Sequence, residues 1–206
     1  MRQTLLPRQC LPRTWLVTDA RTAAVLGHTL RALSRGSGPH SSGPRGSGPR
    51  RSGVIFRHYH LLPAARRAAF RQVLRLCRAR GHVAVLAGSA REALAWGADG
   101  AYGPPALLAP GPAALRLCTA QSLRELAAAA RARADAVLLS PVFPSRSHPG
   151  GRSLGPVRFL LLARRSPVPV IALGGMTAAS ARHLPTYGWA AIDGLARKTR
   201  GILKDS

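Results

Sequence analysis

Two adjacent glycines, Gly174 and Gly175, are the residues of this 206-residue chain that most directly suggest chemistry. They follow Val168–Leu173, a nearly continuous apolar run that predicts a strand covered on both faces. Because glycine has no side chain, the backbone after this strand can approach an anion closely and present N–H groups to it. The pair could also serve only to make a tight turn. The sequence therefore leaves two interpretations of this bend, a phosphate site and a purely structural turn.

A second group of candidates consists of polar side chains at the ends of other predicted strands. They are Arg57, Thr119, Gln121, Ser145, Arg146, His148 and Asp193. A guanidinium group can bind phosphate through paired hydrogen bonds, and hydroxyl, amide and imidazole groups can donate to an anion. The segment 145–148 could instead be a solvated polar loop. Asp193 could be a ligand, a base or a Mg²⁺ contact, or only the cap of the helix after it.

The small number of acids, lysines and thiols restricts the chemistry further. Of the seven acids, only Asp19 and Asp193 end predicted strands. Both lysines come after the last predicted strand, which disfavours a Schiff-base aldolase. The three cysteines have no pairing or metal-binding spacing, which fits a reducing compartment. Cys118 is the one candidate thiol nucleophile, and we favour its interpretation as a small core residue.

The net charge of +24 arises from 31 Lys and Arg against 7 Asp and Glu, and nearly all of it is arginine. One interpretation is a polyanionic partner such as nucleic acid. The other is a compositional bias towards Arg, Ala, Gly and Pro. We favour the bias because arginine is spread over every segment instead of one helix or face. A basic field would still attract phosphorylated small molecules.

The elements that must position these residues alternate between strands and helices. Strands are predicted at 13–19, 54–60, 82–87, 100–102, 115–119, 136–142, 168–173 and 189–193, and helices at 22–34, 64–80, 90–96, 122–133, 157–165, 177–184 and 194–203, with a proline-rich turn at 104–112. About eight strands alternating with about eight helices in a chain this short predict the α/β class and a single (β/α)8 barrel. A doubly wound open sheet is the alternative, but neither GxGxxG nor a P-loop follows any strand. For His58 and His60 in the strand at 54–60, we expect one to face the barrel and the other to face a helix, so at most one histidine is expected to be functional.

The barrel is predicted to occupy residues 13–203, after an N-terminal extension at 1–12. Residues 36–53 repeat a GSGPR-like unit and predict a disordered insertion between the first helix and the second strand. Such a loop would lie at the N-terminal end of the barrel, away from the chemistry. The chain has neither an apolar run long enough to cross a bilayer nor a recognisable secretory signal, so we expect a cytoplasmic location.

Three segments together resemble the thiamine phosphate synthase/TenI family. They are ADAVLLSPVFPSRSHPGGRSLGPVRF at 134–159, VPVIALGGMTAASARHL at 168–184 and ALAWGADGAYG at 93–103. LVTD at 16–19 and IFRHYH at 55–60 stand where that family has its first two strands. The resemblance implies a TIM barrel and a role in thiamine biosynthesis. It implies either a transferase that joins a pyrimidine diphosphate to a thiazole phosphate with Mg²⁺ and releases pyrophosphate, or a relative that processes the thiazole.

By this resemblance and their positions, the candidate residues receive roles. We assign catalysis to Arg57, Gln121, His148 and Asp193, and substrate or phosphate binding to Thr119, Ser145, Arg146, Gly174 and Gly175. The chain departs from the family where Ala87 and Gly88 replace an Asn-Asp pair and where Pro104–Pro105 replaces an acid. Mg²⁺ is therefore weakly supported, and we name no metal ligands and expect no organic cofactor.

The expected partner is a phosphorylated small molecule, and a homodimer stays open. Two alternatives to the active enzyme also stay open. One is a catalytically impaired barrel that binds a phosphorylated metabolite, and the other, less favoured, is a basic nucleic-acid-associated protein. A synthase role and a tautomerase-like role both stay open.

Overall fold

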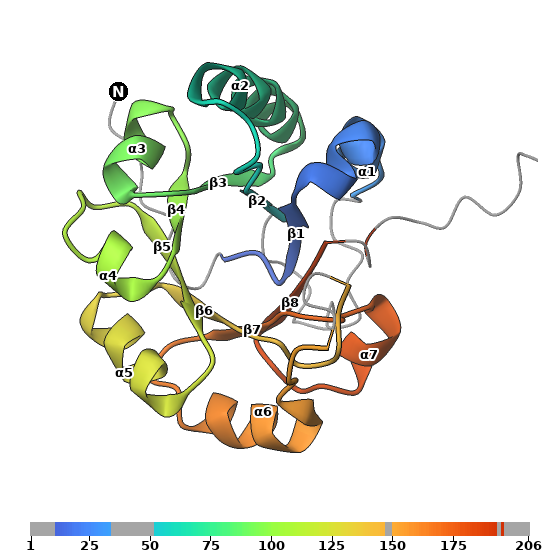
Figure 1. Cartoon of the computed structure of the whole chain (residues 1–206), viewed down its shortest axis with the longest axis vertical. Coiled ribbons are helices and arrows are strands. Elements are labelled where there is room, and N and C mark those ends of the chain that lie inside the picture. Colours follow the sequence, from blue (N-terminus) through green and yellow to red (C-terminus); the bar gives the residue numbers. More distant parts are fainter. Residues whose placement is uncertain (1–10, 34–51, 147–149, 193–194, 196–206) are drawn as a thin grey trace, which may run out of the picture.

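The computed structural model describes residues 11–33, 52–146, 150–192 and 195, which form a closed barrel of eight parallel strands (Figure 1). Each strand pairs with the next, and β8 closes the barrel by pairing with β1. The strands are β1 (Thr14–Thr18), β2 (Gly53–Phe56), β3 (Val83–Ala87), β4 (Gly100–Gly103), β5 (Leu115–Ala120), β6 (Ala136–Leu139), β7 (Val170–Ala172) and β8 (Gly188–Ala191). The (β/α)8 barrel is confirmed, and the doubly wound open sheet is excluded by the closure.

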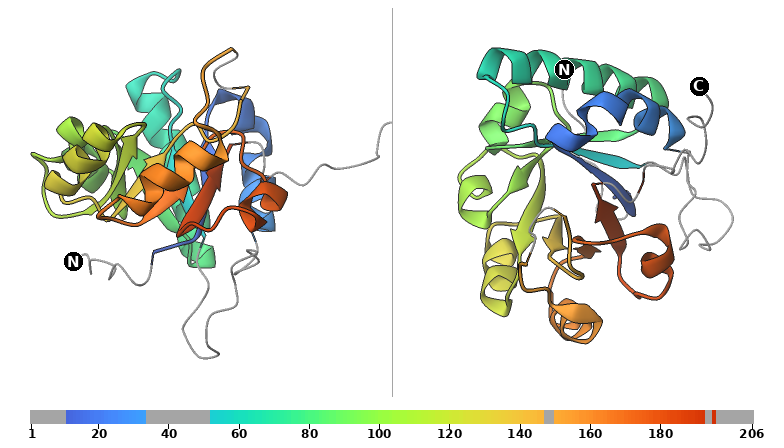
Figure 2. Two further views of the ribbon diagram at one scale, coloured as in Figure 1. Left: turned by 90° about the horizontal axis from the view of Figure 1, so that it is seen from below. Right: turned by 45° about the vertical axis from the view of Figure 1, so that its right-hand side comes forward.

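The helices pack around the outside of the strands, as both views in Figure 2 show. They are the 3₁₀ helix η2 (Ala20–Val25), α1 (Leu26–Ala32), α2 (Pro63–Arg80), α3 (Ala90–Ala95), α4 (Pro105–Leu108), α5 (Leu123–Arg131), α6 (Gly155–Arg164) and α7 (Ala178–Arg182). Local signals in the sequence explain several ends. Gly81 ends α2 in the left-handed conformation, and Ser122 caps α5 by accepting from the N–H of Glu125.

Three local predictions are wrong. Residues 104–112 contain the single-turn helix α4 instead of a turn alone, because a proline suits the first helical position. The second strand ends at Phe56 and not at His60, because His58 has a φ of +36° and leaves the extended conformation. The sixth strand ends at Leu139, just before the Ser140–Pro141 bond, since proline has no N–H for a strand ladder.

The core has two layers on the two faces of the closed sheet. Inside the barrel lie residues such as Trp15, Ile55, Leu117 and Ile171. Their strand neighbours, for example Phe56 and Cys118, pack outward against the helices. This alternation follows from the two-residue period of a strand. It fixes which side chains at the ends of the strands point towards the barrel axis.

The end of the barrel at which the strands begin is closed by large side chains and by residues 11–12. The Trp15 indole donates to the carbonyl of Pro12 at 2.7 Å, and the Tyr187 hydroxyl donates to the carbonyl of Leu11 at 2.8 Å. Leu11 is itself buried among the interior side chains. Apart from Ser52 and Gly53, the predicted insertion at 36–53 lies outside the described residues, as does the predicted last helix apart from Leu195.

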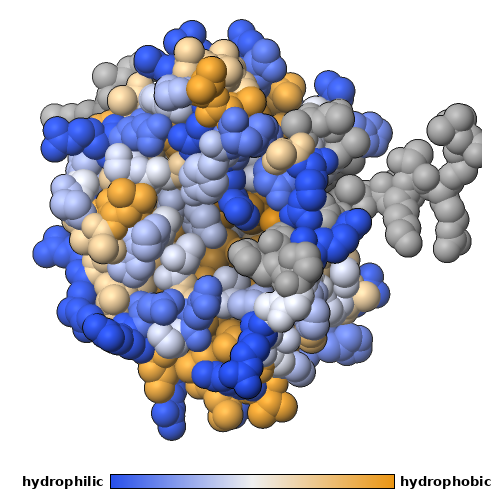
Figure 3. Space-filling model, viewed as in Figure 1, coloured by the Kyte–Doolittle hydropathy of each residue, from blue (hydrophilic) through white to orange (hydrophobic). Residues whose placement is uncertain are grey.

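Among the described residues, the structure has no helix with the length and apolar character needed to span a membrane. Figure 3 shows hydrophilic side chains distributed around the whole visible face of the protein. They are not gathered over one helix, which agrees with the even spread of arginine along the sequence.

Candidate functional site

The glycine bend lies directly after β7 and is open to solvent. Gly174 has a φ of +97° and is half-buried, and Gly175 has a φ of +61° and is exposed. The carbonyls of Leu173 and Gly174 accept hydrogen bonds from the N–H groups of Val142 and Phe143, at 2.9 and 3.1 Å. None of the hydrogen bonds among the described residues uses the N–H of either glycine. The bend is thus a tight turn whose carbonyls are used and whose N–H groups are available to an anion.

Both glycines are required by close packing against the loop that follows β6. A Cβ atom at position 174 would lie 2.6 Å from Cβ of Pro141, and one at position 175 would lie 2.6 Å from the carbonyl oxygen of Pro144. The half-buried Ser145 and the exposed Arg146 come next in this loop. The structure therefore brings residues 141–144, which directly precede Ser145 and Arg146, beside the glycine bend. His148 lies outside the described residues.

On the other side of the barrel, Arg57 follows β2 and is half-buried. Its backbone N–H donates to Thr18 Oγ1 at 3.4 Å, and its guanidinium carbon lies 5.9 Å from the ring centroid of Tyr59. Among the described residues, the Arg57 guanidinium has no carboxylate in ion-pair contact. Arg57 thus offers an unneutralised charge at the C-terminal end of the strands, which we call the barrel mouth.

Asp19, which follows β1, is committed to Arg21. Its carboxylate accepts from Nη2 and Nε of Arg21 at 2.6 and 3.1 Å and from the Arg21 backbone N–H at 3.0 Å. Partial burial opposes the charged form of Asp19, but the hydrogen bonds and charge of Arg21, together with the charge of Arg57, lower its pKa. This acid is therefore ionised and already paired. The other acid predicted at the mouth, Asp193, lies outside the described residues.

Tyr102 is a residue of the mouth that the sequence analysis did not single out. It belongs to the interior layer near the end of β4 and is 8% exposed. Burial raises the pKa of Tyr102 to about 12, and the charge of Arg57 opposes this rise. The phenol therefore keeps its proton and can act as a hydrogen-bond donor near Arg57. The available signal was its position at the end of the short strand predicted at 100–102.

Thr119 and Gln121 occupy different environments at β5. Thr119 is half-buried and alternates with the outward-facing Cys118 and Ala120, so its side chain is on the interior face. Gln121 is exposed, and its backbone N–H donates to Glu125 Oε2 at 2.8 Å. The structure therefore places Thr119 towards the barrel axis and Gln121 at the start of α5.

His58 has a structural environment. Its ring is 3% exposed, lies 3.0 Å from Thr18 Oγ1 through Nδ1 and stacks on Phe56 at a centroid distance of 4.4 Å. Burial, followed by the charge of His60, lowers the pKa of His58, and Asp19 opposes this shift. His60 is exposed. His58 therefore contributes packing and one hydrogen bond as a neutral ring.

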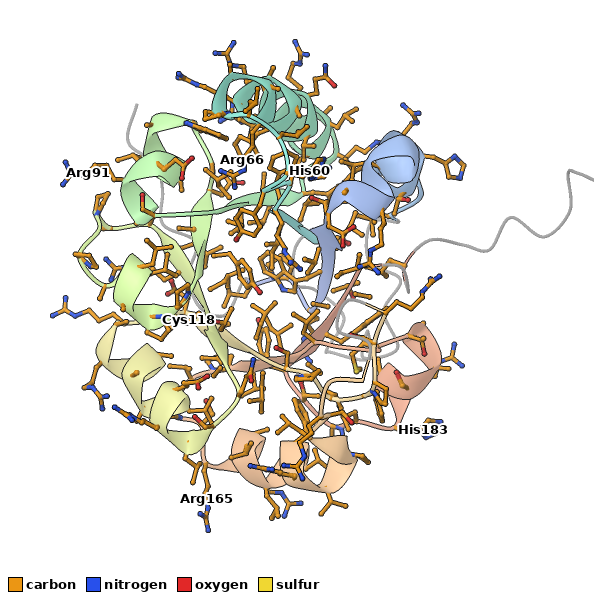
Figure 4. All side chains as sticks on the ribbon, viewed as in Figure 1. His60, Arg66, Arg91, Cys118, Arg165 and His183 are labelled. Carbon is orange, nitrogen blue, oxygen red and sulfur yellow. The ribbon has the colours of Figure 1, made fainter. Side chains whose placement is uncertain are left out.

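A buried arginine, Arg66 of α2, joins the ends of β2 and β3. Its guanidinium donates to the carbonyls of Arg57 and Ala87 and to Glu92 Oε1, which lies 3.2 Å from Nη1. Figure 4 shows Arg66 within the ring of helices, whereas Arg91, Arg165 and His183 point outward. Glu92, an acid that the sequence analysis did not place at this end, also reaches it through Arg66.

The described residues do not fit a Mg²⁺ site. β3 ends at Ala87 and is followed by Gly88, and β4 ends at Gly103 and is followed by Pro104, so neither strand end offers a carboxylate. Within the described ranges, no group of three His, Cys, Asp or Glu side chains could hold a metal ion. Mg²⁺ prefers hard oxygen ligands that include one or two carboxylates, and the carboxylates of Asp19 and Glu92 are paired with arginines.

The one candidate thiol nucleophile is not activated. Cys118 is fully buried on the outward face of β5, and burial raises its pKa to about 11. The thiolate form is therefore negligible near neutral pH. This agrees with the interpretation of Cys118 as a small core residue.

The closed barrel, with its polar groups at the C-terminal ends of the strands, places this protein among the TIM-barrel proteins. A family model described as thiamine monophosphate synthase (TMP-TENI) matches residues 50–195. The chain therefore belongs to the thiamine monophosphate synthase (TMP-TENI) family. The resemblance noted in the sequence is confirmed.

Solved structures share the fold at low sequence identity. Thiamine phosphate pyrophosphorylase from Pyrococcus furiosus is 19% identical with a TM-score of 0.70, and the match covers 93% of this chain and 90% of that one. Thiamine phosphate pyrophosphorylase from Bacteroides thetaiotaomicron is 12% identical with a TM-score of 0.55, covering 95% and 90%. The YdjI aldolase from Escherichia coli K12 is 9% identical with a TM-score of 0.54, covering 89% and 75%. The search of curated proteins finds no match.

Proposed function

We propose that this protein binds a phosphorylated intermediate of thiamine biosynthesis, a thiazole or pyrimidine phosphate, at the barrel mouth. The observation that carries the proposal is the open bend at Gly174–Gly175, whose N–H groups have no acceptor among the described residues. Membership of the thiamine monophosphate synthase family supports this ligand class. Backbone N–H groups at such a bend suit a phosphate because they bring donors close without a side chain between them.

Side chains on other strands complete an anion site in this proposal. Arg57 supplies a charge that no described carboxylate neutralises, and its guanidinium can bind two phosphate oxygens at once. The protonated phenol of Tyr102 and the hydroxyls of Thr119 and Ser145 add neutral donors. The net charge of +24 adds a field that attracts anionic ligands to the protein.

The proposed activity is that of a thiamine phosphate synthase or of a thiazole-processing relative. In either reaction, Arg57 would hold the phosphate, while Gln121, His148 and Asp193 are the further residues proposed for the chemical step. The alternative is a barrel that binds the phosphate and does not turn over. A turnover assay with thiazole phosphate and pyrimidine diphosphate identifies the synthase, because only the active synthase releases pyrophosphate. Conversion of the thiazole phosphate alone would identify the thiazole-processing relative, and no turnover would identify the barrel that only binds.

Binding is tested most directly by calorimetry with thiamine phosphate and thiazole phosphate. Arg57→Gln should weaken binding by about 1.5–3 kcal/mol, the usual contribution of a hydrogen bond to a charged group. Arg165→Gln is the matched control, because it removes one charge from an exposed arginine that points outward at the end of α6 (Figure 4). Equal weakening in the two variants would mean that only the overall charge attracts the ligand. An absence of binding to the unaltered protein would refute the proposal.

One observation favours a polyanion as a second candidate partner. Arg67, Arg71 and Arg75 are exposed on α2 at intervals of four residues, so they share one face of the helix. Binding of a DNA duplex through this row should weaken steeply with salt, and replacing the three arginines by glutamine should reduce the slope of log K against log salt by about 3. An unchanged slope would remove this candidate.

A further inference from the structure

The ends of β2 and β3 hold a permanent cation beside Ala87 and Gly88, which replace the Asn-Asp pair of the resembled family. Arg66 is 8% exposed, and its guanidinium is hydrogen-bonded to the carbonyls of Arg57 and Ala87. The guanidinium carbon of Arg66 lies 5.3 Å from the ring centroid of Tyr59 and 5.3 Å from that of Trp96. Arginine keeps its proton at any physiological pH, so this position carries a fixed positive charge.

Among the described residues, the carboxylate found beside this strand end, that of Glu92, is already paired. Glu92 Oε1 pairs with Arg66 at 3.2 Å. Its other oxygen, Oε2, lies 2.4 Å from the position that a Cβ atom on Gly88 would take. A side chain at position 88 would therefore require the Glu92 carboxylate, the end of a flexible side chain, to shift from this position.

Arg66 also positions Arg57. Arg66 Nε donates to the carbonyl of Arg57 at 3.0 Å, and Arg66 packs on the ring of Tyr59. The guanidinium of Arg57 lies over that ring as well, 5.9 Å from its centroid. Arg66 therefore fixes both the backbone of Arg57 and the aromatic surface on which the Arg57 side chain rests.

We propose that the barrel mouth binds its phosphorylated ligand without a divalent metal ion, with Arg57 as the neutralising charge and Arg66 as the residue that positions it. The inference rests on the proposed function, because it concerns how the same site neutralises the phosphate. Arg21 and Arg66 are paired with Asp19 and Glu92, so the charge of Arg57 leaves these described groups at the ends of β1 to β3 with a net positive charge that would repel a metal cation. A guanidinium group also offers a phosphate paired hydrogen bonds in place of metal–oxygen bonds.

The first test is calorimetry of the full chain with thiamine phosphate in two buffers, one with EDTA and one with excess MgCl₂. We expect dissociation constants that agree within about twofold. Binding that is tightened tenfold or more by Mg²⁺ (about 1.4 kcal/mol) would overturn the inference and leave the proposed function standing. An absence of binding in both buffers would instead refute the proposed function, and with it the inference.

The second test uses the metal alone and needs no variant. Titration of the unaltered protein with Mn²⁺, followed by the electron paramagnetic resonance signal of the free ion, should show no saturable site. A stoichiometric site that Mg²⁺ competes for would contradict the inference. This measurement does not depend on any substitution folding correctly.

The third test examines the positioning role of Arg66. Arg66→Lys keeps the charge but loses the fork that reaches three partners, and it should weaken thiamine phosphate binding by about tenfold. In a cycle with Arg57→Gln, the two losses should be far from additive, because Arg66 acts through Arg57. The matched control is Arg67→Lys, an exposed neighbour on α2. Additive losses, or an equal loss in the control, would show that Arg66 has only a structural role.

Discussion

The glycine bend predicts a specific loss of stability when Gly174 is replaced by alanine. At a φ of +97°, an alanine is strained by about 1–3 kcal/mol. Its Cβ would also lie 2.6 Å from Cβ of Pro141 and 2.7 Å from the Cα of the same proline, well inside the usual 3.5–4.0 Å carbon contact. Overpacking of this kind costs about 1–3 kcal/mol. Gly174→Ala should therefore lower the free energy of unfolding by roughly 2–6 kcal/mol.

Gly81 offers a control with the same kind of substitution but without the contact. It has a φ of +69° at the end of α2, and a Cβ atom there would have no neighbour within 4 Å. Gly81→Ala should therefore cost only about 1–2 kcal/mol of conformational strain. The contrast between the two variants measures the close approach of the bend to the loop after β6.

Urea unfolding followed by circular dichroism gives the free energy of unfolding of each variant. We expect the free energies of unfolding of Gly174→Ala and Gly81→Ala to differ by about 1–3 kcal/mol. In a chain of this size, each kcal/mol corresponds to roughly 2–4 °C in the melting temperature. Equal destabilisation in the two variants would refute the packing argument. It would mean that the loop after β6 moves freely away from the bend, which would also weaken the case for a preformed anion site.

Three further predictions concern His58, Cys118 and Ser122. The folded-state pKa of His58 is lowered below its ordinary 6.5, so the contribution of His58 to stability is complete above that pH and decreases as the pH falls below 6.5 towards the folded-state pKa. In urea unfolding, His58→Gln should therefore lose less stability between pH 7.5 and pH 5 than the unaltered protein does. An unchanged pH dependence would contradict the assignment. Cys118 is fully buried and its pKa is raised to about 11, so its thiol should be unreactive in the folded protein. In a Cys10→Ser, Cys77→Ala background, Cys118 should react with a thiol reagent only as fast as the protein unfolds. Rapid reaction in the native state would show that Cys118 is open to solvent. Ser122→Ala removes the hydrogen bond to the N–H of Glu125 and should cost about 1 kcal/mol in thermal unfolding, whereas a neutral result would mean that water replaces the cap.

Local chemistry in the sequence accounts for many element ends. The end of α2 at Gly81 and the start of α5 after Ser122 follow from backbone preferences that depend only on neighbouring residues. The early end of β2 was not predictable in this way. His58 adopts its positive φ within contacts to Thr18 and Phe56, and the first of these partners is 40 residues away in the sequence.

The sequence by itself determined the fold class and the position of the glycine bend on the chain. The alternation of about eight apolar strands with about eight helices predicts a (β/α)8 barrel. The paired glycines after an apolar strand indicate a close backbone bend. Only the tertiary structure decided which side chains share the mouth. Tyr102 lies at the mouth because strand alternation in a closed barrel turns its side chain inward.

The Arg66–Glu92 pair shows the same limit most clearly. Its members lie on different helices, 26 residues apart, and neither belongs to a strand end. Their meeting depends on how α2 and α3 pack over β2 and β3, and this packing gives the end of β3 a buried guanidinium instead of free carboxylates. Contacts between distant segments are set by the packing of whole elements, so the charge of this strand end could be assigned only from the folded structure.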